Sequence, residues 1–416
     1  MPVTLANDIL PIEETVAPAD AAGVVAVVRE AQAAGRAVYP IGGGTSLDYG
    51  LPGKKPGIGL SLARLNRVVD YPARDMTITM EAGVTMAELA RTLAAEGQWL
   101  PIDAPHPDAA TIGGLVATAW CGPRRYGWGT VRDYVIGISA VDGRGVAFKG
   151  GGRVVKNVAG YDFCKLLTGS LGTLGPITLL TLKVKPRPEC SVLAACDLPS
   201  WESAERLLAA LVQSKTTPAA IELLAGPAWA SDEALGSAAG GSIARVVVGL
   251  EGTAAEVAWM QTQLAGEWRE LGVGDARFVA EDAACALWQR LTDFPAAGGA
   301  PLVVKASIRP SAVCGFVREI LQIDSQASIQ CHAGNGSVIA RFANFSAGDV
   351  SRQLVGKLHP VARAAGGHLV VLSSDGLGEL TRQAVWGGVT AATAWMQRVK
   401  AAFDPANVLN PGRFVV

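Results

Sequence analysis

The feature that most constrains this chain is a run of three consecutive glycines within Pro40–Ser46, which reads Pro-Ile-Gly-Gly-Gly-Thr-Ser. Glycine has no Cβ, so the backbone here can adopt positive φ and come within hydrogen-bonding distance of a ligand. The hydroxyls of Thr45 and Ser46 follow beside a row of N–H groups, and such a concave array of donors binds pyrophosphate well. The apolar stretch Ala37–Tyr39 precedes the run, which indicates a turn after a strand. A plain glycine-rich surface turn is the competing interpretation of these residues alone.

The composition excludes several classes of protein. The length of 416 residues suggests about two domains. Hydrophobic residues make up 50% of the chain and charged residues 18%, which favours large buried cores over disorder. The net charge is −1 and there is no basic block, so we expect no nucleic-acid partner. The N-terminus does not resemble a signal peptide, and no apolar stretch is long enough to span a membrane.

The cysteines point to a reducing compartment. There are seven, they are scattered, and none forms a Cys-x-x-Cys pair. Most are therefore expected to be small buried hydrophobic residues in a cytoplasmic protein. Ligands of an iron–sulfur cluster come at close, repeated spacings, so we expect no cluster in this chain.

The first part of the chain mixes helices and strands. A helix is predicted over residues 20–34 and ends at Gly35; Val24, Val27, Val28 and Ala31 share one face. Residues 76–81 alternate between apolar and polar side chains, which predicts a half-buried strand. Thr85–Glu88 is a capping box and predicts the start of a helix that ends at Gly97. Residues 101–135 are rich in Gly and Pro and predict a long irregular, functional stretch. Further strands are expected at 134–141 and 177–185, before a domain boundary at Pro186–Pro188.

After this boundary the pattern changes. Two successive β-α-β-β-α-β-like units are predicted to form one antiparallel sheet covered by helices. The expected strands are residues 191–198, 219–224, 242–251, 302–308, 328–331, 337–342 and 368–373. The expected helices are residues 200–213, a helix opened by a capping box at Thr253–Glu256, and residues 311–321, 349–365 and 385–402.

Two familiar phosphate-binding motifs are absent, and two more glycine clusters are present. The chain has neither a Gly-x4-Gly-Lys-Ser/Thr loop nor a Gly-x-Gly-x-x-Gly fingerprint between a strand and a helix near its N-terminus. A second cluster, Thr111–Gly114, follows Pro105-His106-Pro107, and a third spans Gly169–Thr178. Each alone is read as a turn. Three such loops in one domain suit a long ligand bound across all of them.

On these and other residues the chain resembles the vanillyl-alcohol-oxidase (PCMH-type) FAD-binding family, and within it the FAD-binding E subunits of glycolate oxidase. The resemblance covers about the first 190 residues and the C-terminal tail, and is looser between them. The Gly-Pro-Arg-Arg run at 122–125 and the Val-Lys-Asn-Val-Ala-Gly-Tyr-Asp run at 155–162 match these subunits in particular. The other matching segments are 40–46, 100–114, 131–133, 151–154, 169–178, 183–188 and 410–413.

The resemblance implies an α+β fold: a PCMH-type FAD-binding domain of two subdomains, and an α+β cap domain whose antiparallel sheet is flanked by helices. We expect the FAD-binding domain at 1–188, the cap or substrate domain, with ferredoxin-like repeats, at 189–384, and a C-terminal helix and tail that return to the FAD domain at 385–416. The FAD is expected to be noncovalent, because members that tether it through the first loop have a histidine there and this chain has none between Tyr39 and Gly50.

The cofactor is expected to place its pyrophosphate on the first loop, its flavin ring and ribityl chain near the second, and its adenine near the third. The expected cofactor-binding residues are Ile41, Gly42, Gly43, Gly44, Thr45, Ser46, Pro105, Thr111, Gly113, Gly114, Gly122, Gly172, Ile177 and Asn410.

Catalytic residues are harder to assign. Arg124, Arg125 and Lys156 are the basic residues nearest the cofactor loops, and a cation near the flavin would stabilise the negative charge that develops on reduction. The competing interpretation is that these three basic residues are solvated at the surface or paired at an interface. His106 either faces the flavin or its phosphate, or is an ordinary hydrogen-bonded loop residue. We take Arg124, Arg125 and His106 as weak candidates only.

No catalytic metal is expected. Relatives that oxidise D-2-hydroxy acids share a His-Ala-Gly-Asp-Gly-Asn-x-His segment and a later Glu-His pair, which hold a divalent metal. Here the first segment begins at His332 and has Ile339 at the second histidine position, and the Glu-His position aligns with Leu372-Ser373. Ile and Leu cannot bind a metal, and a single histidine is a poor site. His332 is therefore expected to be structural.

The resemblance implies an FAD-dependent oxidoreductase that acts as one subunit of a glycolate oxidase complex and converts glycolate to glyoxylate. The implied partners are a larger subunit with FAD and the intact metal motif, and an iron–sulfur subunit that passes electrons to the quinone pool. The chain is expected in the cytoplasm, with contact to the inner membrane only through these partners. Two alternatives stay open: a standalone 2-hydroxy-acid dehydrogenase whose substrate site uses Arg124, Arg309 or Arg341, and a non-catalytic FAD-binding scaffold.

Overall fold

A computed structural model describes residues 10–153 and 160–414, and the chain divides into two compact units. The described part of the first unit comprises residues 10–121, 130–153, 160–187 and 388–414. The second comprises Gly122–Gly129 and Pro188–Gly387. The ranges expected from the sequence did not separate residues 122–129, which group with the second unit. Most of the Val-Lys-Asn-Val-Ala-Gly-Tyr-Asp run, including Lys156, lies outside the described residues.

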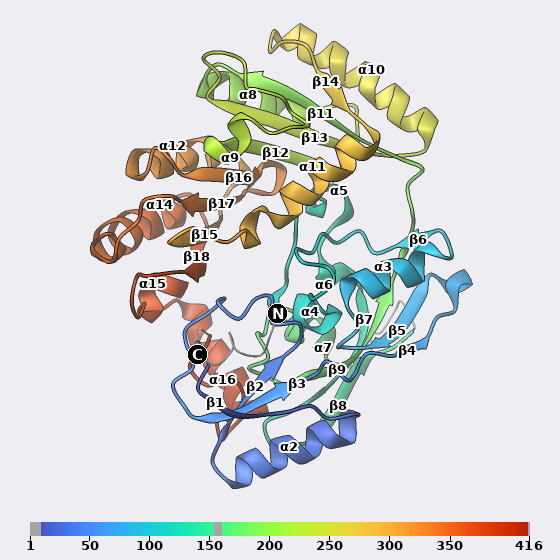
Figure 1. The fold of residues 1–416 in the computed structure, drawn as a ribbon, viewed down its shortest axis with the longest axis vertical. Coiled ribbons are helices and arrows are strands. Elements are labelled where there is room, and N and C mark those ends of the chain that lie inside the picture. The colour runs from blue at the N-terminus through green and yellow to red at the C-terminus, as the bar shows by residue number, and fades with distance from the viewer. Residues whose placement is uncertain (1–9, 154–159, 415–416) are drawn as a thin grey trace. The chain divides into compact units, whose positions relative to one another are not determined.

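The first unit contains a parallel sheet and two antiparallel sheets (Figure 1). Its strands are β1 (Ile12–Val16), β2 (Ala37–Ile41), β3 (Gly57–Ser61), β4 (Val68–Asp70), β5 (Thr77–Glu81), β6 (Gln98–Trp99), β7 (Val135–Val141), β8 (Ala147–Gly151), β9 (Ile177–Lys183) and β10 (Lys185–Pro186). Its helices are α2 (Ala21–Ala33), α3 (Met86–Ala94), α4 (Ile112–Thr118), α6 (Val131–Tyr134), α7 (Phe163–Leu167) and α16 (Ala391–Phe403). The parallel sheet has the order β1-β3-β2, and the larger antiparallel sheet has the order β4-β5-β9-β7-β8. The smaller antiparallel sheet consists of β6 and β10.

Helix α2 forms as its sequence predicts. The Asp20 side chain caps it by accepting from the N–H of Gly23, and Gly35 follows its end with φ +65°. Its four buried residues are the predicted ones, and they pack on β2, β3 and the tail residues Val408 and Leu409. The C-terminal tail is therefore part of the core under the first glycine loop.

Strand β5 corrects one expectation. The alternating sequence predicted a half-buried strand, but all five residues are buried, and β5 is an inner strand that pairs with β4 and β9 along its two edges. Its inward polar groups are paired: the hydroxyls of Thr79 and Thr181 lie 3.0 Å apart. The next helix, α3, has half of its predicted capping box. Thr85 accepts from the N–H of Glu88, whereas the Glu88 carboxylate pairs with Arg91.

The prediction of a long irregular stretch at 101–135 was only partly right: residues 101–110 and 119–124 form no helix or strand, but the rest is largely helical. This segment contains α4, α5 (Arg125–Trp128) and α6, all short. Helix α4 was missed because its first residue is followed by two glycines, which have low intrinsic helix propensity. Thr111 caps it by accepting from the N–H of Gly114 at 3.2 Å.

The second unit is built on one eight-stranded antiparallel sheet of order β14-β11-β13-β12-β16-β17-β15-β18, as the sequence predicted in kind. Its strands are β11 (Cys190–Leu198), β12 (Ala220–Ala225), β13 (Ala244–Gly252), β14 (Arg277–Val279), β15 (Leu302–Ser307), β16 (Ser328–His332), β17 (Ser337–Phe342) and β18 (His368–Ser374). Its helices are α5, α8 (Trp201–Val212), α9 (Pro227–Ala230), α10 (Ala254–Leu271), α11 (Glu281–Asp293), α12 (Val313–Ile323), α13 (Ala347–Asp349), α14 (His359–Ala364) and α15 (Arg382–Trp386).

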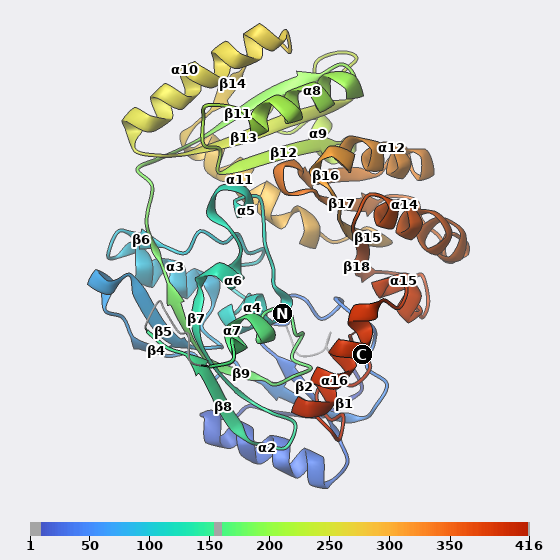
Figure 2. The same ribbon diagram turned by 180° about the vertical axis from the view of Figure 1, so that it is seen from behind.

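Helices α8, α12 and α14 follow one another along this sheet (Figure 2). Two helical predictions need correction. The expected helix 349–365 begins with π-helical turns over Val350–Leu358 before α14. The expected helix 385–402 is two helices, α15 and α16, because Gly387 leaves the helical conformation with φ +79°. Helix α11 was not predicted.

Asp324 connects the end of α12 to the end of β17 and allows a test of this packing. Its buried carboxylate accepts from the N–H groups of Ala343, Asn344 and Gln326 at 2.7–3.0 Å. Burial alone would raise the pKa of this carboxyl, but the hydrogen bonds from Asn344, Gln326 and Ala343 outweigh it and the pKa is lowered from 3.8. The folded state thus binds this proton more weakly than the unfolded state, so the stabilisation is present above pH 3.8 and is lost as the pH falls through the folded pKa.

We therefore expect Asp324→Asn to lower the free energy of unfolding by about 1–3 kcal/mol at pH 7, because an amide offers its neighbours fewer acceptors. The deficit should shrink as the pH falls below 3.8, because the unfolded chain then binds this proton first, and it should be smallest once the native carboxyl is protonated as well. Urea unfolding at pH 7 and pH 3 measures both values. Asp75→Asn, on an exposed turn, is the control and should change stability by about 0.5 kcal/mol or less. A deficit that is the same at both pH values would contradict the argument.

Candidate functional site

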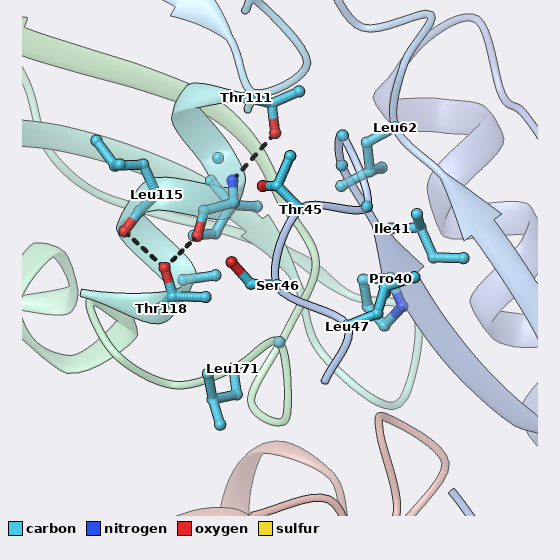
Figure 3. Close-up of a pocket in the computed structure, with 18 of the residues that line it drawn as sticks. Pro40, Ile41, Thr45, Ser46, Leu47, Leu62, Thr111, Leu115, Thr118 and Leu171 are labelled. Carbon is cyan, nitrogen blue, oxygen red and sulfur yellow. Dashed lines mark hydrogen bonds between the residues drawn. The ribbon is translucent and has the colours of Figure 1, made fainter. Parts of the chain in front are cut away.

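A pocket in the first unit collects the three glycine-bearing loops. The space between protein atoms at this pocket, with the open solvent at its mouth included, is about 1050 Å³. The lining residues come from the loop after β2, from Pro105 and the start of α4, from the loop before β9, and from the tail at Asn410 and Arg413. Figure 3 shows Thr45 and Ser46 on the first loop, facing the side of the pocket formed by α4.

The first loop is a cradle that only glycine can form. A Cβ on Gly42 would overlap the Thr111 hydroxyl, and one on Gly43 would overlap the carbonyl oxygen of Ala109. Gly44 has a φ of +71°, a backbone conformation that residues with a side chain rarely adopt. In the part of the chain that the structure describes, no N–H group of residues 42–46 donates a hydrogen bond to another protein group. These donors remain available to an anionic ligand.

The second loop works differently from the first. The N–H of Gly114 is satisfied by Thr111, and the N–H of Gly113 donates to the carbonyl of Ala82 at 2.8 Å. A Cβ on Gly113 would lie 2.7–2.8 Å from Ala82 atoms, so this glycine allows α4 to pack directly on the backbone after β5. Thr118 bonds back to the carbonyls of Gly114 and Leu115 (Figure 3). Gly113 therefore sets the distance between α4 and the sheet, whereas Gly114 provides the N–H group that Thr111 caps.

The third loop is held by the C-terminal tail. Asn410 donates from Nδ2 to the carbonyl of Leu171 at 2.6 Å and from its N–H to Val38 at 2.9 Å. Leu171 and Gly172 both have positive φ, 53° and 68°. The buried amine of Lys400 donates to the carbonyls of Thr173 and Leu409 and pairs with the Asp404 carboxylate. That carboxylate also accepts from the N–H groups of Val408 and Leu409. Burial lowers the pKa of Lys400, and the Asp404 carboxylate opposes this shift.

Arg413 holds the far end of the first loop. Its Nη2 donates to the carbonyls of Leu47 at 2.6 Å and Tyr49 at 3.0 Å. Burial lowers the pKa of the Arg413 guanidinium to about 10, and the nearby Tyr39 phenol and Asp48 carboxylate oppose this shift. Burial also raises the pKa of Tyr49 to about 12, so its phenol stays neutral in the physiological range.

The structure brings together thirteen of the fourteen residues predicted for the cofactor. These pocket residues are Ile41, Gly42, Gly43, Gly44, Thr45, Ser46, Pro105, Thr111, Gly113, Gly114, Gly172, Ile177 and Asn410. Gly122 is not among the lining residues and belongs to the second unit. Sequence reasoning missed Tyr49, Trp120, Leu171 and Arg413, which also line the pocket. Arg413 lies within the matched Asn-Pro-Gly-Arg run, which was the one signal that could have identified it.

The three weak catalytic candidates do not line this pocket. Arg124 donates from Nε to Glu251 at 2.9 Å and stacks 3.9 Å from the Trp288 ring centroid, within the second unit. Trp128 donates to the same carboxylate at 2.8 Å. Arg125 lies on the same short segment. His106 is exposed, has φ +52°, and accepts through its carbonyl from the N–H groups of Ala109 and Ala110.

His332 ends β16 and is buried. Its Nδ1 lies 2.9 Å from Glu222, whose carboxylate also accepts from Gln330 at 2.8 Å. Ile339 and Leu372, which align with ligand positions, are buried in β17 and β18. Within residues 10–153 and 160–414, no group of three or more His, Cys, Asp or Glu residues is arranged to hold a metal ion. No helix of these described segments combines the length and the apolar character needed to cross a bilayer.

Comparison with known families identifies the class of protein. Residues 12–151 match the FAD binding domain family, and residues 187–414 match the C-terminal domain of the FAD linked oxidases. The chain therefore belongs to the FAD-linked oxidases. It is an oxidoreductase, and FAD is its cofactor.

The relatives reported below are named as glycolate oxidase subunits or as a D-lactate dehydrogenase. The chain is 27% identical over 399 residues to glycolate oxidase subunit GlcD of Bacillus subtilis, covering 90% of this chain and 83% of that protein. It is 42% identical over 126 residues to glycolate oxidase subunit GlcE of Escherichia coli, covering 30% of this chain and 36% of that protein. It is 27% identical over 432 residues to the D-lactate dehydrogenase of Archaeoglobus fulgidus, covering 96% and 90%.

Among solved structures, alkyldihydroxyacetonephosphate synthase has a TM-score of 0.69 at 16% identity, over 95% of this chain and 76% of that one. This likeness shows the shared fold. It agrees with the combination of helices and sheets described above, in which an FAD-binding domain precedes an FAD-oxidase C-terminal domain.

The pocket fits the cofactor that the family requires. A dinucleotide needs donors for its phosphates and apolar walls for its rings. The first loop offers a row of N–H donors, and Leu10, Leu62, Trp120 and Ile177 offer apolar surface. The indole Nε1 of Trp120 is buried and has no hydrogen-bond partner in the described protein, which suits a wall completed by a polar ligand.

Proposed function

We propose that the chain holds FAD noncovalently in this pocket, with the thirteen predicted lining residues as its contacts. The diphosphate would lie on residues 42–46, where the N–H groups have no protein partner. Noncovalent binding is supported by the chemistry of the wall: no histidine or cysteine occurs among the described residues that line the pocket. Bound FAD supplies two-electron redox chemistry, and the protein supplies position and charge.

We propose a small 2-hydroxy acid, glycolate, as the substrate of the complex in which the chain works. Oxidation of glycolate to glyoxylate would remove a hydride, which carries two electrons and one proton, from the carbon of the CH–OH group, and a second proton from its hydroxyl. A flavin of the complex would accept the hydride, and the hydroxyl proton would pass to solvent. Support comes from the relatives, two of which are named as glycolate oxidase subunits and one as a D-lactate dehydrogenase.

Within such a complex we propose the role of the E-type subunit. The observation that carries this proposal is the apolar character of Ile339 and Leu372, where the resemblance to metal-dependent relatives implies ligands. A second FAD subunit with an intact metal motif would then oxidise the substrate, and the flavin of this chain would relay electrons. An iron–sulfur subunit would accept them, since the scattered cysteines of this chain do not form a cluster motif. The chain would be cytoplasmic and would reach the inner membrane only through partners.

The experiment is to purify the full chain alone and together with the proteins that co-purify from native cells. We expect the isolated chain to carry yellow, acid-extractable FAD, to show negligible glycolate turnover, and to keep its flavin oxidised when glycolate is added. The co-purified complex should turn over glycolate. Rapid bleaching of the flavin by glycolate in the isolated chain would instead establish a standalone dehydrogenase, and a colourless chain that takes up no FAD would overturn the cofactor assignment.

The arginines considered for a standalone 2-hydroxy-acid dehydrogenase are already engaged in other contacts. Arg124 is paired with Glu251. Arg309 donates to the carbonyls of Ala364 and Ala365. Arg341 donates to the carbonyls of Phe294, Ala297 and Gly298. Each of these guanidinium groups is already used in holding the second unit together, so none is proposed as a carboxylate receptor.

A further inference from the structure

We propose that Arg413 is a cofactor-binding residue whose guanidinium supplies a positive charge and a hydrogen bond to the diphosphate of FAD. Neither the glycine loops nor the family comparison assigns this role to the tail. The proposal rests on the noncovalent FAD site proposed above and adds to it the group that neutralises the phosphates.

The first argument is an unused donor. Only 6% of the Arg413 surface is exposed. Its Nη2 bonds to Leu47 and Tyr49, but its Nη1 is buried and has no hydrogen-bond partner in the described protein. Leaving a buried charged donor unsatisfied is costly, so native proteins rarely do so unless a ligand completes the arrangement.

The second argument is charge. Arg413 is the only charged residue among the described residues that line the pocket; the other lining residues are apolar, glycine or uncharged polar. An FAD diphosphate carries two negative charges into this wall. The N–H groups of residues 42–46 provide partial charges, whereas Arg413 provides a full one.

The third argument is position. Arg413 bonds to the backbone of Leu47, the residue that directly follows the Gly42–Ser46 cradle. The carbonyl of Arg413 in turn accepts from the N–H of Leu51. The groups that face its charge within this unit are Asp48, which is exposed, and the neutral phenol of Tyr39, which bonds to the carbonyl of Lys55. Neither of them bonds to Nη1, so an anion is the missing partner.

The test compares ligands with and without phosphates on the full chain stripped of flavin. Arg413→Met keeps the length of the side chain but removes its charge. We expect this variant to bind FAD and ADP roughly 10- to 100-fold more weakly, which is the usual effect of losing a hydrogen bond to a charged group. Riboflavin, which has no phosphate, should bind about as well as to the native chain. Arg413→Lys should recover part of the FAD affinity, and the salt dependence of FAD binding should be weaker in Arg413→Met.

The control is Arg36→Met, which removes an arginine that pairs with Glu13 and Glu14 outside the pocket; all three ligands should bind within about 2-fold of the native chain. An equal loss for riboflavin and FAD in Arg413→Met would overturn the proposal and leave Arg413 as a support of residues 47–49 only. Unchanged FAD affinity would overturn it as well. Since the readout is binding, the result is independent of whether glycolate is the substrate.

Discussion

Replacing Gly43 with alanine is expected to abolish useful FAD binding. The added Cβ would overlap the carbonyl oxygen of Ala109, which is a backbone atom and cannot rotate away. Either the first loop or the Ala109–Thr111 segment must move, at a cost of about 3 kcal/mol or more. Because both segments form the pocket wall, we expect the affinity for FAD to fall about 100-fold or more.

Fluorescence titration of FAD onto the flavin-free chain measures this effect. Gly266→Ala is the matched control: Gly266 lies within α10, and a Cβ there would meet open space. Alanine should stabilise that helix by about 1 kcal/mol and leave FAD binding unchanged. If Gly43→Ala bound FAD as tightly as Gly266→Ala, the close approach of the two loops would not be required for the site.

Removing the buried amine of Lys400 is expected to be the most destabilising change in the first unit. Lys400 is 7% exposed and Asp404 is 1% exposed. Lys400→Met would leave the Asp404 carboxylate buried without its counter-charge and the carbonyls of Thr173 and Leu409 without their donor. Breaking a buried ion pair by removing one partner costs about 3–5 kcal/mol, so the first unit should unfold at markedly lower urea concentration.

A double variant separates charge from packing. Lys400→Met combined with Asp404→Asn leaves no uncompensated charge and should be more stable than Lys400→Met alone. Lys165→Met, which breaks an exposed pair with Asp162, should cost about 1 kcal/mol or less. A Lys400→Met variant as stable as Lys165→Met would show that the tail is not anchored through this amine. The third loop should also lose order, since Thr173 is one of the carbonyls involved.

The local features of the fold could be predicted from the sequence because they depend on neighbouring residues. The apolar residues of α2 recur at helical spacing, so its buried face was predicted residue by residue. The glycine loops were recognisable as ligand-binding turns for a similar reason: residues 42–44 have no side chains, so a ligand can approach the backbone there. Helix α4 shows the limit of this reasoning, because its two glycines look like a turn until their N–H groups are seen to bond to Ala82 and Thr111.

What the sequence by itself determined was a set of segments: helices, strands and three bends that can each expose backbone donors. Only the tertiary structure decided which of them meet. The contact between Arg413 and Leu47 joins residues 366 positions apart, and that between Arg124 and Glu251 joins residues 127 apart. Spacing along the chain carries no information about such pairs, because burial of the whole core selects them. The same burial groups Gly122 and Arg124 with the second unit and places Arg413 in the wall of the pocket.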